Sequence, residues 1–216
     1  MISDHSDLVR QVEFRVLYIC TANMIRSPIA ERITRMRVQS CAGDGWIRVG
    51  SAGVQGRGGM PMHPIAAETL KAHGAESSGF RTRRLDGSLV EDSDLLLAAC
   101  LEHRDAAVAL HPAASRRSFL LREFVRLVRY VPRPFQGHYA RDLAGQVSRA
   151  QGIVAAAARL RGHIPWQDPL TDEISDPAVT DSGLLASAAE IDEAVTEIVE
   201  TLIGGARSGI SQRDAG

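Results

Sequence analysis

The sequence contains few cysteines, few aromatic residues and almost no lysine. Its three cysteines, Cys20, Cys41 and Cys100, have no repeated spacing, which argues against a disulfide framework and against a C-x-x-C metal site. Aromatic residues make up 5% of the chain, and Lys71 is the only lysine among 25 basic residues. The formal net charge of -1 gives no excess that would favour nucleic acid or an anionic membrane surface. We therefore predict no metal or other cofactor, and neither nucleic acid nor a membrane as partner.

Long hydrophobic runs are also missing. No apolar stretch approaches the length of a membrane span, and the first residues carry early acids without the apolar core of a signal peptide. These absences predict a cytoplasmic protein. At 216 residues, with 44% hydrophobics, the chain suits one well-cored domain and is short for two. We expect a polar lead-in over 1–13, a single domain over 14–204 and a flexible tail over 205–216, and the sequence does not indicate an oligomeric state.

Strand and helix patterns alternate along most of the chain. Short apolar runs predict strands over residues 16–19, 46–51, 94–99 and 118–121. Apolar residues at helical spacing predict helices over residues 28–39, 63–73, 101–110, 122–130, 141–160 and 183–203. This alternation predicts an α/β fold, a doubly wound four-stranded parallel sheet flanked by helices. In such a sheet, ligands bind at the carboxyl ends of the strands, where the strand order reverses.

The first predicted strand runs directly into a loop and a helix start, over residues 16–28. Cys20 ends the strand, and Arg26 follows after five intervening residues. We expect Ser27 to be the N-cap of the next helix and Pro28 its first residue. The backbone N–H groups of such a loop, together with the helix N-terminus, can converge on one point. That point suits a tetrahedral oxyanion.

The side chains of this loop suit cleavage of a phosphate ester. A thiol at a helix N-terminus beside an arginine is stabilised as the thiolate, which makes Cys20 the expected nucleophile. Arg26 offers a planar, permanently charged group that grips two phosphate oxygens at once. Asn23 tolerates a left-handed backbone, and its amide can tie the loop together. The expected substrate-binding residues are those of the loop: Thr21, Ala22, Asn23, Met24, Ile25 and Ser27.

The alternative is that Cys20 is a small buried residue ending a strand, as free cysteines often are. An isolated C-x5-R-[ST] pattern leaves the two interpretations about equal. The strand before the loop, the Ser-Pro helix start after it and the asparagine inside it together favour the functional interpretation.

Residues 16–31, VLYICTANMIRSPIAE, resemble the signature of the low-molecular-weight protein tyrosine phosphatases. Further matching stretches lie at residues 49–53, 94–97 and 174–177. The resemblance spans about residues 14–204, except for 129–172, which we interpret as an insertion. It implies a phosphomonoester hydrolase that acts on a phosphorylated protein or small molecule through a cysteinyl-phosphate intermediate.

Cleavage also needs a carboxylic acid to protonate the leaving oxygen. Asp168 and Asp176 each precede a proline in an acidic loop, where turn-forming Asp-Pro pairs are common, and the residues alone do not choose between them. The resemblance favours Asp176, because the family places its acid in an Asp-Pro shortly before the final helix. It also implies that Ser51 braces Asn23 or the loop backbone; a buried, satisfied serine at a strand end is an equal alternative.

The chain departs from the family pattern at several positions. Ala22 stands where many members have glycine, and Ile25 where many have a second cysteine. Ala178 replaces the aromatic residue that usually follows Asp-Pro, and residues 56–58 supply no aromatic residue for the second wall. These departures predict little preference for a phosphotyrosine ring.

Two other functions fit the same motif. A thioredoxin-coupled arsenate reductase on this fold relays a disulfide through two further, closely spaced cysteines, and only Cys100 lies near that region. A phospho-ligand sensor would bind through the loop without turnover. Hydrolysis of an aryl phosphate separates the enzyme from the sensor.

Overall fold

The structure, a computed structural model, describes residues 13–42, 45–132, 142–164, 169–176 and 181–204. The predicted tail and all but the last residue of the predicted lead-in lie outside these ranges. Asp168 and Ala178 lie outside them as well. None of the helices described is long and apolar enough to cross a membrane.

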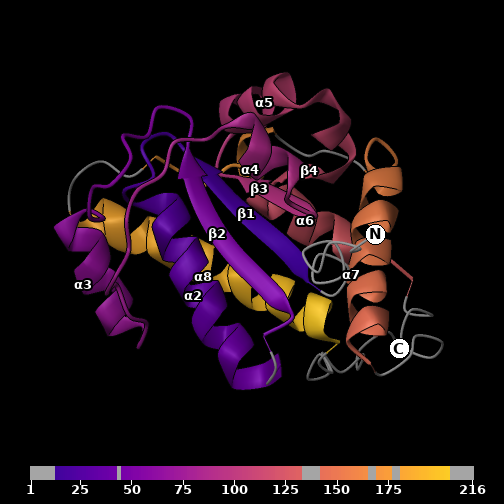
Figure 1. Cartoon of the computed structure of the whole chain (residues 1–216), viewed down its shortest axis with the longest axis horizontal. Helices are drawn as coiled ribbons and strands as arrows, with labels where there is room; N and C mark the ends of the chain where they lie inside the picture. Colours follow the sequence, from indigo (N-terminus) through magenta and orange to yellow (C-terminus); the bar gives the residue numbers. More distant parts are fainter. Residues whose placement is uncertain (1–12, 43–44, 133–141, 165–168, 177–180, 205–216) are drawn as a thin grey trace, which may run out of the picture.

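Four parallel strands form one sheet in the order β2-β1-β3-β4 (Figure 1). The strands are β1 (Phe14–Cys20), β2 (Ile47–Gly53), β3 (Leu95–Ala98) and β4 (Ser118–Leu120). The predicted doubly wound parallel sheet is therefore confirmed. Because β2 and β3 lie on opposite sides of β1, the strand order reverses at β1, and Cys20 ends that strand.

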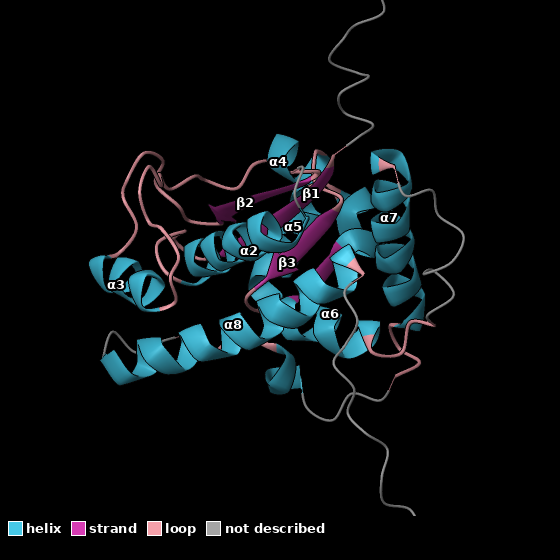
Figure 2. Ribbon diagram, turned by 90° about the horizontal axis from the view of Figure 1, so that it is seen from below, coloured by secondary structure: helices cyan, strands magenta, loops and turns pink. Residues whose placement is uncertain are grey.

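Helices cover both faces of this sheet. The α-helices are α2 (Arg26–Ala42), α3 (Pro64–Ala72), α4 (Gly87–Glu91), α5 (Leu101–Leu110), α6 (Leu121–Val128), α7 (Leu143–Leu160) and α8 (Asp181–Ile203). Short 3-10 helices are η1 (Pro112–Arg117) and η3 (Pro169–Asp172). Figure 2 shows α2 and α8 lying side by side.

The alternation of side chains along β1 divides the core in two. Val16 and Tyr18 pack with α2 and α8 on one face, whereas Leu17 and Ile19 pack with α4, α5 and η1 on the other. Since successive side chains of a strand point to opposite faces, a central strand buried on both sides must be apolar throughout. This requirement explains why the short run before Cys20 identified the strand.

The start of α2 differs from the prediction. The carbonyl of Ile25 accepts the first helical hydrogen bond, from Ile29 N at 3.0 Å, so the helix begins at Arg26. Ser27 and Pro28 lie within the first turn, and Ser27 is not the N-cap, because its hydroxyl bonds to side chains of the preceding loop. The prediction of Ser27 as N-cap was wrong.

The other end of α2 also differs. The predicted helix ended at residue 39, whereas α2 continues to Ala42 and includes Cys41 in its last turn. Helix α4, only five residues long, was not predicted. Its start is stabilised by Asp86, whose carboxylate accepts a hydrogen bond from Leu89 N at 2.9 Å.

Helix α7, part of the predicted insertion, lies at the amino ends of the strands. Gln151 Nε2 donates to Asp94 Oδ1 at 3.0 Å, immediately before β3 begins. In Figure 1, α7 stands at the right, whereas the arrowhead of β2 points to the upper left. Helix α7 therefore covers the end of the sheet opposite to Cys20.

Candidate active site

The loop between β1 and α2 has a backbone that most residues would not tolerate. Asn23 has a φ of 59°, and it is the only non-glycine residue with positive φ in the described part of the chain. Gly53, at the end of β2, lies directly against the loop. A Cβ there would lie 2.7 Å from Thr21 O and 2.7 Å from Asn23 N, so only glycine fits. The left-handed asparagine and this close approach together fix the path of the loop.

The peptide groups of the loop have a common orientation. Four carbonyls accept hydrogen bonds from outside the loop: Cys20 O from Val54 N, Thr21 O from Gln55 N, Met24 O from His63 N and Ile25 O from Ile29 N. Among the bonds of the described residues, none is donated by the amides of residues 21–25. Because N–H and C=O point in opposite directions across a trans peptide, the amides that follow these carbonyls point away from those donors. These amides are therefore available as donors to a bound anion.

The Cys20 thiol lies at the base of this loop. The residue is 3% exposed, and its Sγ lies 3.0 Å from Ser27 Oγ. Asn23 Nδ2 donates to the same Ser27 oxygen at 3.0 Å, and the Ser27 proton has two acceptors in reach, the Cys20 sulfur at 3.0 Å and Ala52 O at 3.4 Å. The first turn of α2 therefore places a hydroxyl in contact with the thiol, together with the positive end of a helix.

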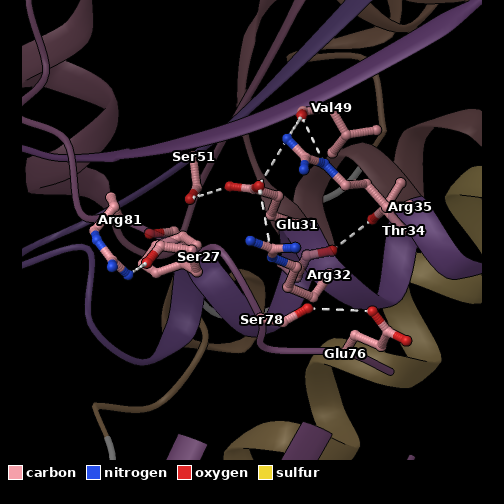
Figure 3. A network of polar contacts seen from close by, with 12 residues as sticks. Ser27, Glu31, Arg32, Thr34, Arg35, Val49, Ser51, Glu76, Ser78 and Arg81 are labelled. Atoms are coloured by element: carbon pink, nitrogen blue, oxygen red, sulfur yellow. Dashed lines mark hydrogen bonds and ion pairs between the residues drawn. The ribbon is translucent and has the colours of Figure 1, made fainter. Parts of the chain in front are cut away.

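A line of polar side chains connects the loop to helix α2, and Figure 3 shows its part at Ser51, Glu31 and Arg35. Asn23 Nδ2 donates to Ser51 Oγ at 2.8 Å, and Ser51 Oγ donates to Glu31 Oε2 at 2.5 Å. Glu31 is 4% exposed, and its other oxygen lies 2.9 Å from Arg35 Nη2. Arg35 also donates to Val49 O at 2.8 Å. The asparagine that shapes the loop is thus held by a buried carboxylate, whose charge an arginine balances.

Sequence reasoning gave no role to Glu31, although the residue lies within the family-like stretch. Its position four residues after Ser27 places both side chains on one face of α2. That spacing was the available signal, but the contact with Ser51 depends on tertiary structure.

Arg26 and Asp176 meet at the open side of the loop. Arg26 Nη2 lies 2.9 Å from Asp176 Oδ1, and Arg26 Nη1 donates to Ile174 O at 3.3 Å. The Arg26 side chain is 7% exposed, whereas that of Asp176 is 81% exposed. An ion pair so open to water contributes little to stability, so the contact indicates where Asp176 lies rather than what holds the fold together.

The segment that carries Asp176 is anchored before it reaches the loop. Ile174 N donates to Ala99 O at 2.8 Å, just after β3. The carboxylate of Glu173 accepts from Leu101 N, at the start of α5, at 3.0 Å. These bonds hold residues 173–174 at the carboxyl end of β3.

His103 contacts the loop from α5 and was not predicted as a site residue. Its Nε2 lies 2.9 Å from Thr21 Oγ1, and its Nδ1 lies 3.1 Å from Cys100 Sγ. Burial, and then the charge of Arg26, lower the pKa of His103 to about 4, against an opposing effect of Asp176. Burial raises the pKa of Cys100 above its ordinary value. At neutral pH the imidazole is therefore uncharged and Cys100 is a thiol.

The remaining predicted residues occupy the rim of the loop. Ala22 is exposed, and Thr21, Met24 and Ile25 are partly buried. Of the two Asp-Pro candidates, Asp176 lies beside the loop, and Asp168 is outside the described residues. Within the described residues, no group of three or more His, Cys, Asp or Glu side chains could hold a metal ion.

Fold and site together define a class of protein. It is a doubly wound α/β protein with a thiol, a guanidinium and unbonded amides in one anion-sized loop, at the switch point of the sheet.

Known proteins identify the family within this class. Residues 15–141 match the family described as low molecular weight phosphotyrosine protein phosphatase. The chain is 31% identical over 127 residues to the low molecular weight protein-tyrosine-phosphatase Etp of Escherichia coli (strain K12), covering 58% of this chain and 81% of that relative. It is 30% identical over 112 residues to a protein-arginine-phosphatase of Geobacillus stearothermophilus, covering 52% and 72% respectively.

The fold agrees with this match. The crystal structure of the low molecular weight protein tyrosine phosphatase from T. tengcongensis superposes with a TM-score of 0.61 at 23% identity, covering 87% of this chain and 99% of that one. The protein belongs to the low molecular weight phosphotyrosine protein phosphatase family, and it is a cysteine-dependent phosphatase.

Proposed function

We propose that the protein hydrolyses phosphomonoesters through a phosphoryl group carried by Cys20. The observation that supports this most directly is the hydrogen bonding of the loop, in which four carbonyls are bonded while the amides of residues 21–25 donate to no group in the described structure. In the proposed reaction, Cys20 Sγ attacks phosphorus and the alcohol leaves. Water then hydrolyses the cysteinyl-phosphate. Arg26 and the amides of residues 21–25, with Ser27 beside the sulfur, hold the transferring oxygens throughout.

We assign Asp176 as the acid that protonates the leaving oxygen. Its carboxylate lies 2.9 Å from Arg26, which supports a place beside the bound phosphate. Once the alcohol has left, the same carboxylate can take a proton from the attacking water. Ser51 acts indirectly in this scheme, because it is fully buried and holds Asn23.

We propose that the substrate is a phosphorylated protein or small molecule in the cytoplasm, without preference for an aromatic ring. Among the related proteins, one is named for phosphotyrosine and another for phosphoarginine. Of the aromatic side chains in the described residues, only Tyr130, after α6, is largely exposed. Stacking of one ring adds about 0.5–1.5 kcal/mol beyond area burial, so a site without such walls gains little from the ring.

The test is hydrolysis of a small aryl phosphate, with and without EDTA. We expect turnover that EDTA does not change and that Cys20→Ser abolishes, while the serine variant still binds vanadate. A serine variant that retains even about a tenth of the activity would remove Cys20 as nucleophile, because such catalysis depends on the thiolate.

The substrate class is tested separately. A phosphotyrosine peptide should gain less than about tenfold in kcat/KM over the small aryl phosphate. A phosphoarginine peptide measured beside it shows whether a phosphoryl group bound to nitrogen is accepted. A strong preference for the tyrosine peptide would contradict the predicted lack of aromatic walls.

A further inference from the structure

His103 is a buried histidine that the proposed reaction does not use. It lies in the first turn of α5 and is 3% exposed. Its Nε2 lies 2.9 Å from Thr21 Oγ1, and Arg26 Nη2 donates to the same oxygen at 3.2 Å. On its other side, Nδ1 lies 3.1 Å from Cys100 Sγ. A continuous chain of contacts therefore leads from Cys100 through the imidazole and the threonine to the guanidinium.

The threonine matters because Arg26 has only a few fixed partners. Nη1 donates to Ile174 O, whereas Nη2 donates to Thr21 Oγ1 and forms an ion pair with Asp176. Asp176 is 81% exposed and, as the proposed acid, must turn toward the leaving oxygen. The Thr21 hydroxyl therefore still holds Arg26 Nη2 when Asp176 turns toward the leaving oxygen. A two-point grip on phosphate needs the guanidinium plane to be fixed.

We propose that His103 is a positioning residue for Arg26, and that it acts by holding the Thr21 hydroxyl. This rests on the proposed function, in which Arg26 binds the transferring phosphoryl group. Cys100, at the other ring nitrogen, fixes the rotation of the imidazole.

The charges around the ring are consistent with this role. Arg26 and Asp176 are the charged groups that act on it, and Cys100 is a thiol. A doubly protonated ring would set a second cation against Arg26, and the lowered pKa of His103 keeps the ring neutral. A neutral imidazole has one donor and one acceptor nitrogen, so it can serve the thiol and the hydroxyl together.

Two amide substitutions separate the two contacts of the ring. The side chain of His103→Gln reaches the position of Nε2 and can still bond Thr21, whereas that of His103→Asn reaches only the position of Nδ1, beside Cys100. Both remove the ring, so both lose its packing. His111, at the far end of α5, has no side-chain bond in the described structure, and His111→Asn is the matched control.

The probe is inorganic vanadate, and its binding to the full chain carrying Cys20→Ser is measured by calorimetry. The kinetic constants kcat and KM of the same variants are measured in the chain that keeps Cys20. We expect His103→Asn to weaken vanadate binding roughly tenfold and His103→Gln to stay within about threefold. His111→Asn should change neither. Thermal unfolding should shift alike in the two His103 variants. Equal affinities in the Asn and Gln variants would reduce His103 to a packing residue and overturn the proposal.

Thr21→Val tests the route through the threonine. Combined with His103→Asn it should add no further loss of affinity, because both changes break one chain. Losses that multiply independently would contradict the route through Thr21. The vanadate affinities of the variants can follow this pattern even if the chain without substitutions hydrolyses no aryl phosphate. In that case the proposed function fails while the role of His103 stands.

Discussion

Asp176 is exposed and close to Arg26, and its proposed role predicts a specific kinetic pattern. General acid catalysis typically contributes about 10²–10⁴-fold, and it matters most when the leaving group is poor. Asp176→Asn should therefore slow hydrolysis of phenyl phosphate far more than that of 4-nitrophenyl phosphate. Asp168→Asn is the matched control and should slow both little. The reverse pattern would show that Asp168 is the acid.

His103 predicts how stability depends on pH. Its pKa is about 4 in the folded protein and about 6.5 in the unfolded chain, so between these values only the unfolded chain binds the proton. The free energy of unfolding should then fall as the pH decreases from 6.5 to 4, by roughly 2–3 kcal/mol from this residue.

Urea unfolding at several pH values measures this fall. Carboxylates with a lowered pKa, such as Glu13 and Asp86, also lose stabilisation at acid pH, so the wild type alone is not sufficient. His103→Gln isolates the histidine, because it cannot be protonated. The curves of the two proteins should converge toward pH 4; parallel curves would exclude the buried neutral imidazole.

At the scale of an element, α2 links the loop to the edge of the sheet. Ser27, Glu31 and Arg35 follow one another at intervals of four residues, and so lie on one face of the helix. Ser27 contacts the thiol, Glu31 contacts Ser51, and Arg35 balances Glu31 and bonds the edge strand at Val49 O. Movement of this helix would therefore shift two contacts together: that of Ser27 with the thiol, and that of Glu31 with Ser51, which holds Asn23.

This arrangement predicts a difference between two arginines of equal exposure. Arg35→Met leaves the buried Glu31 without its closest cation and should lower the free energy of unfolding by about 1–2 kcal/mol. The control is Arg122→Met, since Arg122 is also 44% exposed but lies 3.8 Å from the partly exposed Glu190. It should cost less than about 0.5 kcal/mol. Equal losses in urea titrations would mean that Arg35 acts only as a surface charge.

Sequence patterns predicted the sheet and most helices because those depend on local apolar spacing. Helix α5 matches its predicted bounds, and the strands differ by a few residues at their ends. Helix α4 was missed because five residues are too few to show a helical period. The predicted start of α2 was wrong. Ser27 is a residue type that often caps helices, but here its hydroxyl contacts Cys20 and Asn23.

In the site, too, the sequence predicted what depends on local spacing and missed what depends on tertiary contacts. Cys20, Arg26 and Asn23 stand close together in the sequence, so their spacing was readable. Glu31 and His103 reach the loop only through tertiary contacts with Ser51 and Thr21, and no spacing in the chain encodes those contacts. The assignment of catalytic roles stays a prediction until it is measured.

At the scale of the whole molecule, helix α7 lies at the end of the sheet opposite to the loop. The match to the family ends at residue 141, before α7 begins at Leu143. Helix α7 buries Ile153 and Val154 in the main core and covers the amino ends of the strands. We therefore expect this helix to stabilise the fold without shaping the phosphate site.

Ile153→Ala tests that separation. Removing a buried isoleucine side chain should lower the free energy of unfolding by about 2–4 kcal/mol. At a temperature where the variant remains folded, kcat/KM for an aryl phosphate should stay within about twofold of wild type. A large loss of activity in the folded variant would show that α7 influences the loop across the sheet.

The most direct test of the central claim is to trap the phosphoryl group on the protein. Asp176→Asn should be mixed with 4-nitrophenyl phosphate, quenched within the first turnovers and digested for mass spectrometry, with Cys20→Ala as control. The account predicts one phosphoryl group on the peptide that contains Cys20, a matching burst of nitrophenol and neither in the control. Phosphate on another residue, or steady turnover in the Cys20→Ala protein, would contradict it.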